Sequence, residues 1–378
     1  MKKLSVLIAL ALAGQAGAST LADSRSIAIG GTGVASANYI SASLHNPALA
    51  ANHSSEDGFG MLLPTLAARI HDGDDMIDEL EDFQGINDSL SSNPSEQELE
   101  QWRNALRKLD GNEVNAEATF GLVIAIPNSL VSTNFFTKAN GISLGKTIVD
   151  EDDLDLDDPN FEDLNSFAQA IGGGTLDIGL SLAKSFETSG GIWQVGASPK
   201  YQRLYSLNYK ATVDSYEDDD FDIDDRLEKS GFNIDLGTAY HFDNGVSLGL
   251  VGRNLVSREL KTNVSQSSQA TFQVKPEFTA AAAFTGDWYQ MAFDIDLNKR
   301  QYFKEYDYKL QYARLGAEVE AKWAQVRVGY AYSITSSGSD LLTAGFGFTP
   351  WGKFGLDLSG QVGKDDHYAL SAQFIFTL

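Results

Sequence analysis

The chain has 378 residues, no cysteine and a formal net charge of −24. The lack of cysteine excludes disulfides and thiol chemistry, and the acidic balance argues against a nucleic-acid binder, because phosphate contacts need a basic surface. The mean hydropathy of −0.20 does not separate a soluble protein from a transmembrane β-barrel, since barrels distribute apolar residues by alternation rather than in long runs.

The N-terminus has the pattern of a secretory signal. Lys2 and Lys3 precede an apolar stretch at residues 4–12, and Ala16-Gly17-Ala18 offers small residues for cleavage before Ser19. We expect residues 1–18 to be removed on export. After this segment there is no run of eighteen or more apolar residues, so a membrane-spanning helix is not predicted.

Residues 19–57 are rich in small residues and poor in charge. Glycines at positions 30, 31 and 33 permit close backbone approach and positive φ, and Asn46-Pro47 predicts a fixed bend. Such a segment can occupy a narrow space, so we expect an N-terminal hatch. A phosphate-binding loop around Gly31-Thr32-Gly33 is disfavoured, because a preceding strand, a complete GxGxxG motif and a lysine are all missing.

The rest of the chain, residues 58–378, reads as a series of strands. Alternation of apolar and polar residues between turn signals predicts fourteen of them, at 58–70, 114–127, 130–140, 174–188, 192–213, 230–243, 246–258, 269–285, 287–298, 308–320, 323–334, 340–349, 353–363 and 367–378. An even number suits a closed antiparallel barrel.

The last strand shows the alternation most clearly. Small and polar residues occupy one face, and the other face is apolar, with Tyr368, Leu370, Ala372, Phe374, Phe376 and Leu378. Lipid tolerates a backbone only when every N–H and C=O group is paired internally. We therefore predict an all-β fold, a 14-stranded antiparallel transmembrane β-barrel in the bacterial outer membrane of a Gram-negative cell. A soluble β-sandwich would also alternate.

The connections between the predicted strands favour the barrel. Short turns follow the even-numbered strands, and Trp193, Trp288, Trp323 and Trp351 lie beside such turns, as in an aromatic girdle at the inner interface. Three acidic segments follow odd-numbered strands: 71–113 carries a charge of −10, 150–163 carries −9 and 214–228 carries −8. The mature chain outside these segments is nearly neutral. We expect long solvated outer loops on an embedded wall.

The first long loop, 71–113, has helical periodicity. Apolar residues recur at helical spacing in two segments, and Ser95 with Glu98 forms a capping-box pattern before the second, which continues through Leu99, Trp102, Leu106 and Leu109. We predict a small extracellular insert of two short amphipathic helices. Their apolar faces either guard a ligand entrance or pack on each other and on the barrel rim, and the packing interpretation is favoured.

The sequence offers little catalytic or metal-binding chemistry. The five histidines show no metal-ligand spacing and no nucleophile elbow, so we predict no enzyme, no cofactor and no metal site. The acidic segments 150–163 and 214–228 resemble calcium loops only in charge, because the ordered ligand spacing is missing. Solvated loops are favoured over loose divalent binding at the outer leaflet.

Two motifs carry a resemblance to known proteins. The run Gly30-Gly31-Thr32-Gly33-Val34-Ala35, followed by His45-Asn46-Pro47-Ala48-Leu49-Ala50, resembles the N-terminal hatch of FadL-type long-chain fatty-acid transporters, which are fourteen-stranded barrels. Within that superfamily the acidic exported chain, with Gly249-Leu-Val-Gly-Arg-Asn-Leu255 and a terminal Phe-Ile-Phe, resembles the TraF-like proteins of plasmid or conjugal transfer. The resemblance implies that the hatch is carried by Gly30, Gly31, Gly33, Asn46, Pro47 and Ala48.

Three functions remain open at this stage. The first is passive transport of a small hydrophobic or amphipathic ligand, with lumen polarity set by Lys200, Gln202, Asp294, Asp296 and Arg327. The second is a structural or docking barrel whose acidic outer loops meet a basic protein partner of a conjugal transfer or secretion apparatus. The third, a barrel-embedded hydrolase, has no residue to carry it. Under all three, outer-membrane lipid and lipopolysaccharide surround the wall, and nucleic acid is not a partner.

Overall fold

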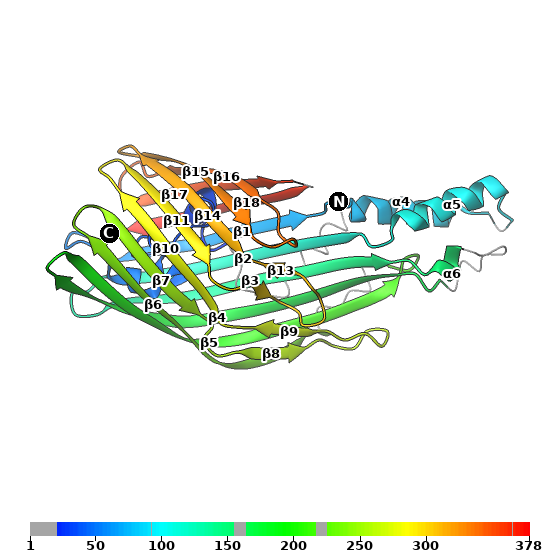
Figure 1. Cartoon of the computed structure of the whole chain (residues 1–378), viewed down its shortest axis with the longest axis horizontal. Coiled ribbons are helices and arrows are strands. Elements are labelled where there is room, and N and C mark those ends of the chain that lie inside the picture. Colours follow the sequence, from blue (N-terminus) through cyan, green and yellow to red (C-terminus); the bar gives the residue numbers. More distant parts are fainter. Residues whose placement is uncertain (1–20, 92, 155–163, 217–224, 365) are drawn as a thin grey trace.

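The computed structural model describes residues 21–91, 93–154, 164–216, 225–364 and 366–378, and the predicted signal segment lies outside them. Fourteen antiparallel strands close into one barrel (Figure 1), and β1 pairs with β18 to seal it. The wall strands are β1 (Gly60–His71), β2 (Glu113–Ile126), β3 (Ser132–Ile148), β4 (Phe167–Thr188), β5 (Gly191–Thr212), β6 (Leu227–Phe242), β7 (Val246–Arg253), β10 (Glu277–Thr285), β11 (Tyr289–Asp296), β14 (Tyr312–Glu320), β15 (Ala324–Ser333), β16 (Leu341–Phe348), β17 (Phe354–Gly363) and β18 (His367–Thr377). The predicted fold class is confirmed.

The wall is apolar outside and polar inside. In β18, Leu370 is 74% exposed on the outer face, whereas Gln373 on the inner face is 1% exposed. The four tryptophans beside the short turns all have exposed side chains. A closed barrel with such a belt is a transmembrane protein of the outer-membrane type, because only lipid matches the exposed apolar band. Among the described residues, no helix is long and apolar enough to cross a membrane.

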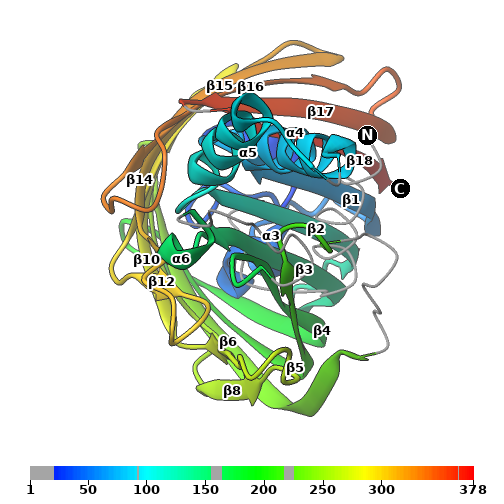
Figure 2. The same cartoon turned by 90° about the vertical axis from the view of Figure 1, so that its right-hand side faces the viewer.

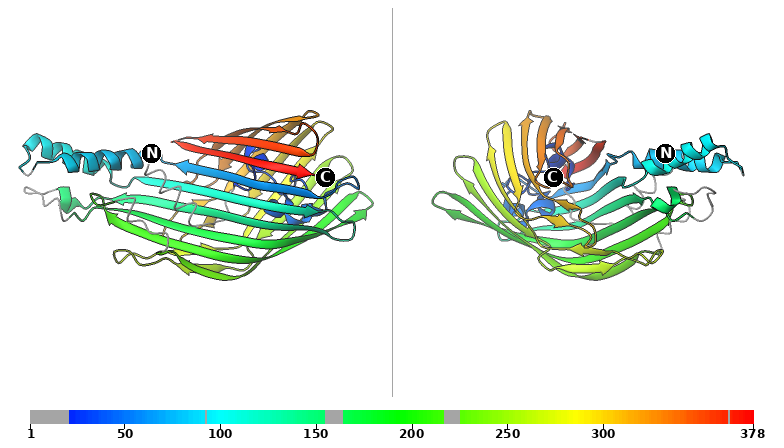
Figure 3. Two further views of the ribbon diagram at one scale, coloured as in Figure 1. Left: turned by 180° about the vertical axis from the view of Figure 1, so that it is seen from behind. Right: turned by 45° about the vertical axis from the view of Figure 1, so that its right-hand side comes forward.

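The wall is much taller on one side than on the other. β4 and β5 have 22 residues each, whereas β7, β11 and β16 have 8. The long strands extend past the short ones at the outer end, where the helices also lie (Figure 3). The predicted strands 130–140 and 174–188 were too short, because β3 continues to Ile148 and β4 already begins at Phe167. Small residues such as Gly141, Ser143 and Gly145 weaken the alternation there.

The predicted helical insert is present at the outer end, where Figure 2 looks onto it. It consists of α4 (Met76–Ser89) and α5 (Glu96–Lys108), and the capping box of Ser95 with Glu98 is formed. The apolar faces pack on each other and on the upper wall, in a cluster that includes Leu80, Phe83, Trp102, Leu106, Leu109 and Ala168. The packing interpretation of these faces is confirmed. A short helix, α6 (Glu151–Leu154), follows β3, and the rest of the two other acidic segments lies largely outside the described residues.

Two short hairpins turn away from the wall and were not predicted. They are β8 (Arg258–Lys261) with β9 (Thr271–Val274), and β12 (Arg300–Gln301) with β13 (Lys309–Leu310). A bridge between Phe272 and Phe303 joins them. Their apolar side chains meet inward-facing residues of β3, β4 and β5 and also of β14, β15 and β16. We call residues 258–274 and 300–310 the outer plug, because they connect opposite sides of the lumen.

Candidate functional site

The hatch lies inside the barrel, at the end of the short turns. It contains α2 (Ser24–Ala28), α3 (Ala42–His45) and a 3-10 helix, η1 (Pro47–Ala51). From residue 21 to residue 51, all but Arg25, Gly31 and Asn38 are buried. A segment made of small residues therefore fills the inner part of the lumen (Figure 1).

Hydrogen bonds hold the hatch to several strands of the wall. The N–H groups of Gly33 and Val34 both donate to Asp294 Oδ2, at 3.0 Å each. The Gly30 N–H donates to Thr343 Oγ1 at 2.9 Å, and the Asn46 side-chain amide donates to the carbonyl oxygen of Thr238 at 3.1 Å. These bonds involve β11, β16 and β6, so the hatch is fixed around the circumference of the barrel.

Glycines of the wall allow this close fit. A Cβ atom built at any of six inward positions would overlap hatch atoms, and these positions are Gly196, Gly237, Gly249, Gly316, Gly329 and Gly345. We call these residues the glycine ring. On the hatch side, Gly30 and Gly31 have φ values of 76° and 85°, which favour glycine. At Gly196, Gly249, Gly316 and Gly329 the nearest hatch atoms belong to the main chain, whereas at Gly237 and Gly345 they belong to the side chains of Asn46 and Ala28.

A buried acid–base pair connects the two ends of the hatch. Asp23 contacts His45 Nε2 and also caps α2 by accepting from the Ser26 N–H at 3.0 Å. Burial tends to raise the pKa of Asp23, but His45 and the Ser26 hydrogen bond outweigh it and hold this pKa below its ordinary value of 3.8. The carbonyl oxygen of His45 accepts from Arg253 at 2.9 and 3.0 Å, which ties the pair to β7.

The five residues predicted to face the lumen all point inward and are at most 8% exposed. The structure does not bring them into one site. Lys200 bridges Asp177 and Asp235 at 2.9 Å each, and Gln202 donates to Asp177 at 2.9 Å. Asp294 serves the hatch, as described above.

The other predicted lumen charges also have partners. Asp296 accepts two hydrogen bonds from Arg314, at 2.8 Å each, and Arg327 pairs with Glu318 and Asp357. The sequence reasoning did not assign these partners, although they lie on inward register positions of two other wall strands, β14 and β17. These charges are paired and buried, so they do not line an open pore.

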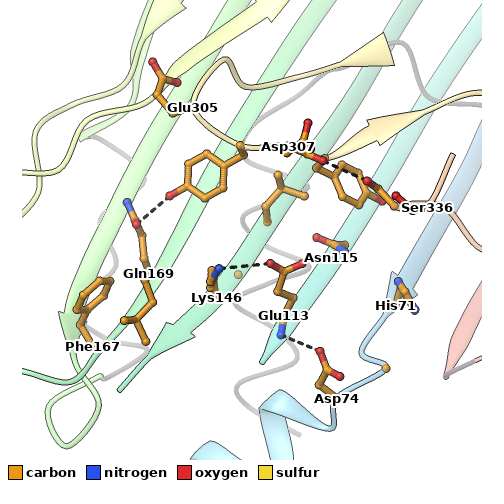
Figure 4. Close-up of a pocket in the computed structure, with 17 residues that line it drawn as sticks. His71, Asp74, Glu113, Asn115, Lys146, Phe167, Gln169, Glu305, Asp307 and Ser336 are labelled. Carbon is orange, nitrogen blue, oxygen red and sulfur yellow. Dashed lines mark hydrogen bonds and ion pairs between the residues drawn. The ribbon is translucent and has the colours of Figure 1, made fainter. Parts of the chain in front are cut away.

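A large open space lies at the outer end, above the outer plug. This cavity, which we call the vestibule, has a volume of about 790 Å³. Its wall comes from β1 to β4, from the tip of the second plug hairpin and from the β15–β16 loop (Figure 4). A second cavity, next to the hatch and to Lys200, measures only about 20 Å³, which is room for about one water molecule. The vestibule thus ends at a closed lumen.

Several charged and aromatic side chains line the vestibule, and none of them was predicted as a site residue. Asp74 lies near the end of β1, Glu113 and Lys146 face each other at 3.7 Å, and Tyr306 donates to Gln169 at 2.8 Å. Burial and the neighbouring Glu305 raise the pKa of Tyr306, so its hydroxyl remains a donor. These residues are far apart in the sequence, and only the barrel and the second plug hairpin bring them together.

Comparisons with known proteins agree with this architecture. The family model described as "F plasmid transfer operon, TraF, protein" matches residues 43–296. None of the curated proteins matches the chain. Among solved structures, a TodX deltaS2S3 mutant monoaromatic hydrocarbon channel is similar, with a TM-score of 0.55, 12% identity and coverage of 96% of this chain and 99% of that one.

Two further structures are similar over almost their whole length. The Pseudomonas putida toluene transporter TodX has a TM-score of 0.52 and 11% identity, and covers 94% of this chain and 97% of its own. A Pseudomonas aeruginosa FadL homologue has a TM-score of 0.50 and 12% identity, with coverage of 94% and 96%. At this identity the likeness establishes the fold, a FadL-like barrel.

Proposed function

We propose that this chain, which belongs to the family described as F plasmid transfer operon, TraF, protein, is a passive outer-membrane channel for small hydrophobic or amphipathic molecules. The vestibule carries the proposal, because it is a preformed cavity on the outer side of a closed lumen. The barrels with the same fold include proteins described as a toluene transporter and a monoaromatic hydrocarbon channel. No catalytic step is part of the proposal.

The apolar lining of the vestibule continues into the outer plug. Leu144 lines the vestibule and also belongs to the apolar cluster that contains Phe272 and Phe303. A hydrophobic molecule that leaves the vestibule therefore meets apolar side chains, which can move aside by changing rotamer. It would reach the hatch next, where passage requires that backbone hydrogen bonds to the wall open.

The test is uptake of toluene by liposomes that contain the full-length mature chain. We expect uptake above that of protein-free liposomes, and we expect Leu144→Trp to reduce it several-fold, because the larger side chain fills the vestibule floor. Leu358→Trp is the matched control, because Leu358 is 48% exposed on the outer face of β17. Equal uptake with and without the chain would contradict the proposal.

A second experiment concerns the hatch. Removal of residues 19–45 should make the barrel leak small solutes if the hatch is the inner seal.

A second candidate is a docking barrel in a conjugal transfer or secretion apparatus. It is supported by the family description and by the helices α4 and α5, which extend beyond the wall at the outer end. The segment around them is strongly acidic and would steer a basic partner. Deletion of residues 76–108 should then abolish partner binding and leave toluene uptake unchanged, whereas a channel role alone predicts no partner to lose.

A further inference from the structure

The vestibule carries more negative charge than its partners neutralise. Four carboxylates line it, from Asp74, Glu113, Glu305 and Asp307, together with one lysine, Lys146. Lys146 pairs with Glu113, Lys309 pairs with Asp307, and Lys210 adds a third ammonium group beside Phe167, so the carboxylates exceed the ammonium groups by one. Within the described part of the chain, neither carboxylate of Asp74 and Glu305 forms an ion pair. Among the described residues, each of these two carboxylates accepts only a backbone N–H, from Glu113 at 3.2 Å and from Thr271 at 2.7 Å.

These two carboxylates lie on opposite sides of the cavity. Asp74 belongs to the segment between β1 and α4, whereas Glu305 belongs to the second plug hairpin, and Figure 4 shows them at opposite edges of the vestibule. A cation between them is attracted by both. The net charge of −24 also favours cation binding, because the electric field of an acidic chain concentrates cations in its clefts.

Aromatic rings supply part of the lining, and one of them already holds an ammonium group. Phe167 lines the vestibule, and Lys210 Nζ lies 3.4 Å from the centre of its ring. Such contacts are a general way to bind ammonium groups. Tyr306 and Tyr308 provide further apolar surface beside Glu305, and both pack against the apolar cluster of the outer plug.

We propose that the vestibule selects amphipathic organic cations, with the cationic group between Asp74 and Glu305 and the apolar body against Phe167, Tyr306 and Tyr308. This inference rests on the proposed channel function and names its ligand class. A neutral hydrocarbon would use only the aromatic surface. An anion would be repelled by both carboxylates.

The test is equilibrium dialysis of the full-length mature chain in non-ionic detergent, with three probes of one shape: benzyltrimethylammonium, benzyl alcohol and phenylacetate. We expect the cation to bind at least about tenfold more tightly than the anion at low salt, as two carboxylates in a solvated site allow. Binding of the three probes within about threefold of one another would overturn the proposal.

Paired variants locate the effect. The double variant Asp74→Asn with Glu305→Gln should remove most of the preference. The control double variant, Asp82→Asn with Asp88→Asn, removes two charges from exposed positions on α4. It should retain the preference for the cationic probe. Equal loss in both variants would overturn the assignment to the vestibule. Heat-modifiable gel migration reports whether each variant is folded.

Two readouts keep the inference separate from the channel function. On the unmodified chain, raising the salt from about 0.05 M to about 0.5 M should weaken the cation preference, because screening shortens the reach of both carboxylates. A preference that is insensitive to salt contradicts the proposal. Cation-selective binding without toluene uptake would refute the channel and leave the site, whereas uptake without selective binding would refute the site and leave the channel.

Discussion

The inner and outer halves of the lumen are closed in different ways. In the inner half, the hatch meets the glycine ring largely through its main-chain atoms, and a cavity of only about 20 Å³ lies beside it. In the outer half, the outer plug closes the lumen with side chains such as Phe272 and Phe303, and the vestibule of about 790 Å³ stays open above it. Side chains can move by changing rotamer, whereas the hatch can move only if its hydrogen bonds to the wall open. Under the proposed channel function, the outer half would select a molecule and the inner half would seal the lumen.

The largest expected effect is on the outer plug. Phe272 is fully buried against Gly173 and Phe303, so Phe272→Ala should destabilise the plug by about 3–5 kcal/mol. We expect faster toluene uptake in liposomes and no change in hatch protection against protease. The control is Phe284→Ala, a ring on the lipid face that is 37% exposed. If uptake stays the same, the outer plug is not a barrier and the two halves do not differ in the way described.

The next effect concerns the inner seal. In Gly329→Ala the new methyl group would overlap Gly30 and Ile29 of the hatch, and overpacking of this kind costs about 1–3 kcal/mol or more. We expect protease cleavage within residues 21–51 of an otherwise folded barrel. Gly355→Ala is the matched control, since the nearest atom to its Cβ would be Thr349 Oγ1 at 3.4 Å. An uncleaved hatch in Gly329→Ala would show that the close fit is not needed.

The smallest effect is a pH dependence of the hatch. The pKa of Asp23 in the folded protein is below its ordinary value of 3.8. The ionised Asp23 carboxylate therefore contributes its full stabilisation above pH 3.8, and this stabilisation is lost as the pH falls through the pKa of the folded protein. Each pKa unit corresponds to about 1.4 kcal/mol. Hydrogen exchange of the Ser26 N–H, corrected for its intrinsic rate, should stay slow down to about pH 4 and rise below it. Asp23→Asn should remove this rise in the exchange rate. A rise that persists in Asp23→Asn would show that another group causes it.

Alternation predicted the wall well, because lipid on one side and a polar lumen on the other impose a period of two on every strand. It failed where both faces meet protein. The predicted strand 269–285 is in fact β9 and β10 with Lys275-Pro276 between them, and Phe272 faces the plug rather than lipid. A buried face and a lipid-facing face look the same in sequence, although the proline was an available signal.

The candidate site was harder to predict than the fold. The hatch residues and the five lumen residues could be assigned to the interior from small-residue content, resemblance and register. The vestibule could not be assigned, because Asp74, Phe167 and Glu305 come from three distant segments whose contact depends on how the plug hairpins turn inward. Register shows that a side chain points inward, but it does not show which other side chain it meets.

The glycine ring also has a consequence for assembly. Since the hatch packs directly against wall glycines on several strands, a finished cylinder offers no spare room for its insertion. We therefore expect the N-terminal segment to be in position when β1 and β18 pair and close the seam. The hatch would then be enclosed during assembly rather than inserted afterwards.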